Sequence, residues 1–85
     1  SWGIETVKKF TKQEILDKLN ALSDIDKYGV ILRAKGIVDS FDAEWIHFDY
    51  VPNEPDVRFG TNAVCGRICV IGADINEDAI KELFL

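Results

Sequence analysis

Apolar residues recur along the chain at two different spacings, and the changes of spacing mark the predicted elements. Over 12–23 they return every three or four positions, which is typical of one face of a helix. Thr11 precedes this stretch and Glu14 lies three residues on, the pattern of a capping box. The sequence therefore predicts a first helix over 12–23, whose buried face is Ile15, Leu16, Leu19 and Leu22.

A second helical pattern closes the chain. Asn76 is a favourable N-cap, and two carboxylates follow it in the first turn, where the helix dipole favours negative charge. The apolar positions behind this cap again have helical spacing. We therefore expect a second helix over 76–84, with Ala79, Ile80, Leu83 and Phe84 on its buried face.

Alternation with a period of two predicts the strands, which we place at 2–9, 28–38, 45–51 and 67–71. A short edge strand at 56–59 is one of two open interpretations, since Pro52 and Pro55 interrupt the ladder and that segment could also be a loop. Residues 24–29 are predicted to be a polar connection. Residues 39–44 are rich in Asp and Ser, which is typical of a turn.

The predicted order, β-α-β-β-(β)-β-α, gives an α+β fold. We expect a two-layer sandwich, in which two helices cover one face of an antiparallel sheet of four to five strands. The length suits a single domain spanning residues 1–85, and we expect that domain to be a fragment of a larger protein. The predicted core is Ile15, Leu16, Leu19, Leu22, Leu32, Phe48, Val70, Ile80 and Leu83.

The face opposite the helices is the candidate functional surface. If Leu32 and Phe48 point into the core, alternation puts charged and aromatic side chains on the other face, with Ile31 and Ile71 among them. Such a cluster favours an interaction surface, although a solvated face with cross-strand pairs such as Lys35–Asp49 would show the same pattern. The predicted interaction residues are Arg33, Lys35, Trp45, His47, Asp49 and Arg67.

Charge and cysteine content narrow the possible partners. The net charge of −5 argues against a nucleic-acid binder, because phosphate contacts require a basic surface. No apolar run is long enough for a membrane span. Cys65 and Cys69 would lie about 13 Å apart on one strand, too far for a disulfide. We therefore expect a cytoplasmic protein with free thiols and neither membrane nor nucleic-acid partners.

The sequence contains no recognisable catalytic or ligand-binding motif. Neither G-x-x-x-x-G-K-[ST] nor G-x-G-x-x-G occurs in it. His47 is the single histidine, and nothing in the sequence brings it together with the two cysteines as a closed zinc site would require. We predict no catalytic, cofactor-binding or metal-ligating residue in this chain, which is then not itself an enzyme.

Three segments resemble the C-terminal domain of the CobW-like GTPases. They are GVILRAKG at 29–36, WIHFDYVP at 45–52 and GRICVIG at 66–72, the last followed by a short helix. The resemblance covers nearly the whole chain. The first two segments are specific as a pair, whereas the third alone would be a weak signal.

The resemblance implies a parent protein in which a P-loop GTPase domain precedes this one. Such proteins are regarded as metallochaperones, acting in zinc homeostasis, cobalamin synthesis or metal insertion. GTP, magnesium, a transition metal and a C-x-C-C motif would belong to the parent's GTPase domain. The implied partners are that domain and a client metalloprotein. The alternatives are a stand-alone small-ligand or metal-binding module and, least favoured by the charge, a nucleic-acid module that uses its sheet face.

Overall fold

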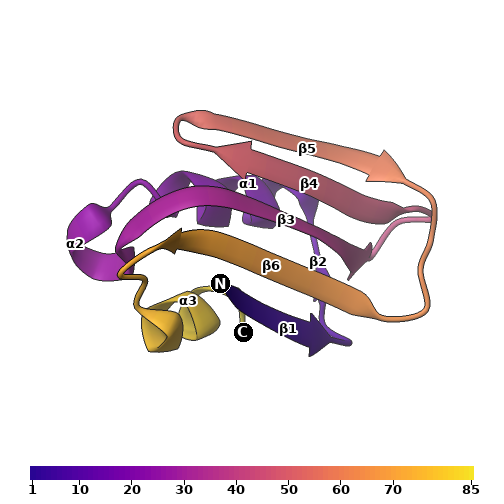
Figure 1. The fold of residues 1–85 in the computed structure, drawn as a ribbon. Coiled ribbons are helices and arrows are strands. Elements are labelled where there is room, and N and C mark those ends of the chain that lie inside the picture. Colours follow the sequence, from indigo (N-terminus) through magenta and orange to yellow (C-terminus); the bar gives the residue numbers. More distant parts are fainter.

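One antiparallel sheet runs through the whole chain in the computed structural model, which describes residues 1–85 (Figure 1). Its strands follow the order β1-β6-β3-β4-β5, so the first and last strands of the sequence lie side by side. A short strand, β2, pairs in parallel with the end of β3. The strands are β1 (Trp2–Thr6), β2 (Lys9–Phe10), β3 (Val30–Ser40), β4 (Trp45–Val51), β5 (Glu54–Gly60) and β6 (Gly66–Ala73).

The helices cover one face of this sheet. They are α1 (Lys12–Ala21), the single-turn α2 (Ile25–Tyr28) and α3 (Glu77–Phe84). Phe84 of α3 stacks on Phe48 of β4, with the ring centroids 6.3 Å apart. Ile15 and Leu19 of α1 join the same buried cluster. The predicted α+β sandwich is therefore confirmed, and its second face carries no helix. None of the three helices combines the length and the hydropathy needed to span a bilayer.

Local capping explains where the two longer helices begin. The amide of Glu14 donates to the Thr11 hydroxyl at 3.1 Å, and the Thr11 amide donates to the Glu14 carboxylate at 2.9 Å. At α3 the Asn76 side chain accepts from the amide of Ala79 at 3.2 Å. Both caps satisfy backbone donors that the first helical turn would otherwise leave free. They match the starts that the sequence predicts.

The placement of Leu32 in the core is wrong. Leu32 is 54% exposed, whereas Ile31, which was predicted to lie on the open face, is 4% exposed and joins the core. The pairing of β3 with β6 shifts register between Ile31 and Arg33. A bulge of this kind adds one residue to a strand, so it reverses the alternation on one side of it. Leu32 therefore joins Arg33 on the exposed side of the sheet.

The core also differs from the prediction at its margins. Leu83 is only partly buried against it, and Leu16 is half-exposed. The remaining predicted members are buried as expected. Phe84 is also buried, as expected from the buried face of the second helix. The structure adds core residues from β2, α2, β3, β4 and β6, namely Phe10, Tyr28, Ile31, Ala34, Val38, Ile46, Tyr50 and Ile68.

Two short elements fall outside the predicted scheme. Residues 24–29 contain α2, which the Asp24 side chain caps through the amide of Lys27. β2 has only two residues, so alternation cannot reveal it. Of the two interpretations of residues 56–59, the edge strand is correct, and it runs from residue 54 to 60 with Pro55 inside it. Proline is tolerated there because an edge strand has one side without a partner.

Candidate interaction surface

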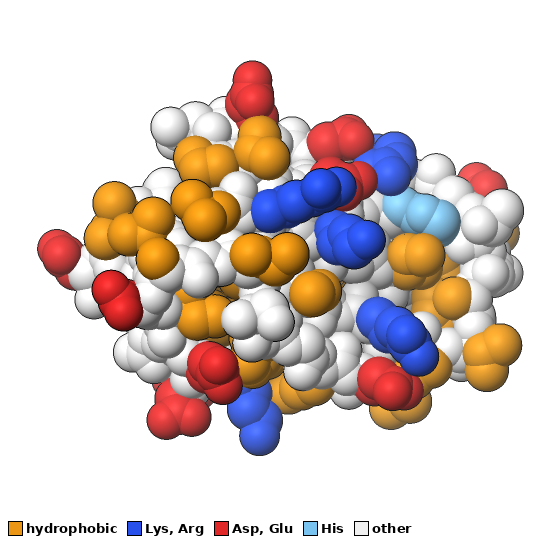
Figure 2. Space-filling view, in the orientation of Figure 1, with side chains coloured by type: hydrophobic (Ala, Val, Ile, Leu, Met, Phe, Trp, Pro, Cys, Tyr) orange, Lys and Arg blue, Asp and Glu red, His pale blue; other side chains and the backbone are white.

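The sheet face without helices presents all six residues predicted from the sequence. Arg67, Ile37 and His47 lie opposite one another across β6, β3 and β4, and Cys69, Lys35 and Asp49 form the next such row. Arg33 and Trp45 lie at the two ends of this array. Arg33, Lys35 and Arg67 are exposed and the other three are half-buried. Figure 2 shows this face, on which blue cationic side chains gather near its centre with apolar ones around them.

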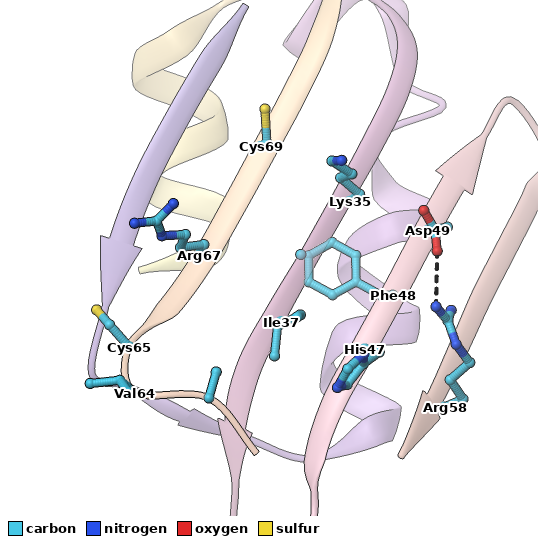
Figure 3. Close-up of a pocket in the computed structure, with 12 residues that line it drawn as sticks. Lys35, Ile37, His47, Phe48, Asp49, Arg58, Val64, Cys65, Arg67 and Cys69 are labelled. Carbon is cyan, nitrogen blue, oxygen red and sulfur yellow. Dashed lines mark hydrogen bonds and ion pairs between the residues drawn. The ribbon is translucent and has the colours of Figure 1, made fainter. Parts of the chain in front are cut away.

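A groove of about 780 Å³ occupies part of this face (Figure 3). Its floor is formed by β3, β4 and β6, and the segment 63–65 makes one wall. Four of the predicted residues line it, and Arg33 and Trp45 lie outside it. The lining residues are Lys35, Gly36, Ile37, His47, Phe48, Asp49, Arg58, Ala63, Val64, Cys65, Arg67 and Cys69.

Two glycines shape this part of the sheet. A Cβ on Gly36 would come within 2.5 Å of both the Phe48 ring and the Arg67 carbonyl oxygen, so only glycine lets Phe48 pack there. A Cβ on Gly60 would come within 2.8 Å of the His47 ring. The His47 imidazole can therefore lie across Gly60, where its Nε2 is 2.8 Å from the carbonyl oxygen of Thr61.

The wall segment is held to the sheet by Asn62. Its side-chain oxygen accepts from the backbone amide of Trp45 at 3.0 Å, and its amide group donates to the Ala43 carbonyl at 3.4 Å. The neighbouring Val64 side chain is fully exposed. The wall thus has a fixed base and an uncovered apolar side chain.

Asp49 is the centre of the ion pairs on this face. Arg58 contacts it at 3.2 Å and also contacts Asp56 at 2.8 Å, while Arg33 lies 3.7 Å from the other Asp49 oxygen. The alternative interpretation paired Asp49 with Lys35, which is its register partner. That pair does not form, because the two arginines occupy the carboxylate. All four side chains are partly exposed, so each pair contributes only up to about 1 kcal/mol.

The thiol of Cys65 forms a hydrogen bond with the carboxylate of Glu5. Its Sγ donates to a Glu5 oxygen at 3.3 Å. This hydrogen bond raises the pKa of the Cys65 thiol above its ordinary value, and the negative charge of Glu5 acts in the same direction. Cys65 and Cys69 are both free thiols. The structure contains no group of three or more His, Cys, Asp or Glu side chains that could hold a metal ion.

The sequence did not single out Arg58, Val64 or Cys65 as parts of this surface. Arg58 enters only because β5 pairs with β4 and puts it opposite His47. The proline residues obscured that pairing. Val64 and Cys65 lie in an irregular segment, whose path no periodicity can predict. The sequence shows a cysteine at position 65, but it does not show which side chains lie beside that cysteine in the fold.

Comparisons with known proteins agree with this architecture. The model of the family "Cobalamin synthesis protein cobW C-terminal domain" matches residues 1–85. The crystal structure of the Zn(II)-bound YjiA GTPase from E. coli matches with a TM-score of 0.75 at 16% sequence identity. A Zn(II)-bound triple mutant of the YjiA GTPase matches equally well. No curated protein sequence gives a significant match to the chain.

The share of each chain that is covered defines the extent of this likeness. The match includes 98% of the present chain but 27% of the YjiA chain, so the chain spans about a quarter of that GTPase. At this identity the structural match shows the fold alone, whereas the family model covers every residue. The family resemblance noted in the sequence is thereby confirmed. The chain belongs to the family of CobW C-terminal domains.

Proposed function

We propose that this chain is a non-catalytic accessory domain of a CobW-like, GTP-dependent metal chaperone. It docks through its open sheet face on the GTPase domain of the same polypeptide or on a client metalloprotein. GTP, magnesium and a transition metal are handled by the rest of the parent protein. That protein acts in the cytoplasm, in metal insertion, cobalamin synthesis or zinc homeostasis.

The observation that carries this proposal is the open sheet face itself. Leu32 is 54% exposed and Ile71 is 45% exposed there, beside the groove and the charged side chains. Scattered apolar residues are normal on a surface, but a cluster rimmed by polar groups is typical of an interaction site. Arg33 and Trp45 suit such a site, because arginine and tryptophan often dominate binding energies.

The double substitution Arg33→Glu, Trp45→Ala tests this proposal. Both side chains lie outside the buried core, so the variant should remain folded. Its affinity for the separately expressed GTPase domain should fall more than tenfold, which corresponds to about 1.4 kcal/mol. Isothermal titration calorimetry measures the affinity, and circular dichroism checks the fold.

A matched control is available on α2. Lys27→Glu, Ile25→Ala also reverses one exposed cation and truncates one exposed apolar residue, but on the helical side. This control should keep the wild-type affinity. Equal affinities for wild type, test variant and control, with no loss of client binding, would leave the open face a merely solvated surface.

A stand-alone small-ligand or metal-binding module is the second candidate. The groove favours it, since about 780 Å³ lies within the usual range for small-molecule sites. The codons that precede Ser1 discriminate between the two. A G-x-x-x-x-G-K-[ST] loop between a strand and a helix supports the accessory domain, and an initiator methionine at this point supports the module.

A further inference from the structure

Lys35 and Arg67 form a pair of neighbouring cations without an acidic partner. Arg67 is the register partner of Ile37, and Lys35 lies two residues before Ile37 on β3. The two cations are thus diagonal neighbours on one sheet face, with their Cα atoms about 7–8 Å apart. Neither takes part in an ion pair in the structure. Both side chains are long and flexible, so one anion between them could contact both cations.

The carboxylates nearest to this pair in the strand register contact other side chains. Asp49 is the register partner of Lys35 but contacts Arg58 and Arg33. Glu5 is the register partner of Arg67 but accepts the thiol of Cys65. Lys35, Arg58 and Arg67 line the groove together with the carboxylate of Asp49, and Arg58 also contacts Asp56. Lys35 and Arg67 are therefore the two cations of the groove that form no ion pair. These two cations lie in a chain whose net charge is −5.

Apolar groups flank the cation pair within the same groove. Ile37 lies between Arg67 and His47 on the floor, and Val64 is fully exposed on the wall. Cys69 lies directly beside Lys35. The groove thus offers an apolar contact within reach of two cations. A partner that fits it carries an acidic side chain next to an apolar one.

We propose that the groove receives an acidic segment of the GTPase domain, with one carboxylate held between Lys35 and Arg67. This inference rests on the proposed function and specifies the chemistry of its contact. The guanidinium of Arg67 can bind a carboxylate through two hydrogen bonds, and the ammonium of Lys35 adds a charged donor. The neighbouring apolar side chain of the segment packs against Ile37 and Val64.

The test compares neutral variants of the cation pair with neutral variants elsewhere. Lys35→Gln, Arg67→Gln removes both charges and keeps polar side chains of similar length. Lys9→Gln, Lys81→Gln makes the same change outside the groove, on two exposed lysines. The dissociation constant for the separately expressed GTPase domain is measured by calorimetry in 50 mM and 300 mM NaCl.

The groove variant should bind at least tenfold more weakly at low salt and should lose most of the salt dependence of wild type, because exposed charge pairs are screened. The lysine control should retain both the affinity and the salt dependence. A reciprocal Glu→Lys change in the acidic segment should restore binding when position 67 is also changed by Arg67→Glu. Amide spectra should confirm that each variant is folded.

The outcomes separate this inference from the proposal on which it rests. Wild type that associates neither with the GTPase domain nor with a client metalloprotein overturns both. Association with a client alone overturns the groove inference only. Association that Arg33→Glu, Trp45→Ala weakens, but that Lys35→Gln, Arg67→Gln leaves unchanged, overturns the groove inference alone. Inorganic phosphate and a hexaglutamate peptide are further probes, titrated into the chain by NMR. Shifts at Lys35 and Arg67 with phosphate alone would assign the pair to a small anion and overturn the acidic segment.

Discussion

The thiol of Cys65 shows how one hydrogen bond controls the reactivity of a residue. Only the thiolate is a good nucleophile, and the bond to Glu5 raises the pKa of Cys65, so less thiolate is present at a given pH. Glu5→Gln removes the negative charge that stabilises the protonated thiol. The pKa of Cys65 should therefore fall.

We expect the pH profile of Cys65 alkylation by iodoacetamide to shift to lower pH in Glu5→Gln. Both proteins should carry Cys69→Ser, so that a single thiol reacts. Glu54→Gln, an equivalent change on β5, should leave the profile unchanged. An unchanged profile in Glu5→Gln would show that Glu5 does not control this thiol.

Ile31 and Leu32 are neighbours with opposite surroundings, so the same truncation should affect them very differently. Ile31→Ala should cost about 2–5 kcal/mol of unfolding free energy, because it leaves a cavity in the core. Leu32→Ala should cost no more than about 0.5 kcal/mol, because the side chain is mostly in solvent. Urea denaturation measures both values. A larger loss for Leu32→Ala than for Ile31→Ala would contradict the bulge in β3.

The bulge also shows what alternation can and cannot predict for single residues. From Ala34 onward the alternation of β3 predicts the exposed side correctly, so Lys35 lies where it was expected. Before Arg33 it fails, because one additional residue reverses the order. Nothing in the stretch Ile31-Leu32-Arg33 signals this, since no glycine or proline marks the bulge.

At the scale of the element, the capping box of α1 is a local feature with a measurable contribution. Thr11→Ala removes the acceptor of the Glu14 amide and should lower the unfolding free energy by about 1 kcal/mol. Thr61→Ala is the matched control, since the Thr61 hydroxyl is no part of a cap and only its carbonyl is used by His47. Thermal denaturation measures both. Equal stability of the two variants would mean that the box contributes nothing.

Elements long enough to show a hydrophobic periodicity could be predicted from the sequence, and the shortest elements could not. The bounds of β4 match the predicted 45–51, because three aromatic or apolar residues alternate there with polar ones. α2 is a single turn, so it cannot show helical periodicity, although Asp24 already provided a cap. β2 is defined only by its partner at the end of β3. Such elements depend on tertiary contacts rather than on their own sequence.

For the whole molecule, we expect the isolated chain neither to bind nor to hydrolyse GTP. The chain has no phosphate-binding loop, and its helix caps serve their own helices. Calorimetry with GTP and magnesium should show no heat of binding. The separately expressed GTPase domain is the positive control. A micromolar affinity for the chain alone would contradict the accessory role.

The candidate surface could be predicted as a face but not as a site. Alternation in β3, β4 and β6 predicts six side chains on one side of the sheet, and the registers of the strands place all six on that face. The groove, however, depends on the path of residues 63–65 and on the pairing of Arg58 opposite His47. Both result from the assembled sheet. The two unpaired cations become visible only when the partners of Asp49 and Glu5 are known.

The pairing of β1 with β6 has a consequence for how this domain can form during synthesis. Trp2 pairs with Val70, so the edge of the sheet at β1 cannot be completed until the residues up to Val70 have left the ribosome. Pairings between such distant segments slow folding, because a long loop must close first. Until then β1 remains an unpaired strand, and such strands tend to associate with other chains. An early-made neighbouring domain or a chaperone would be of most use to this protein in that interval.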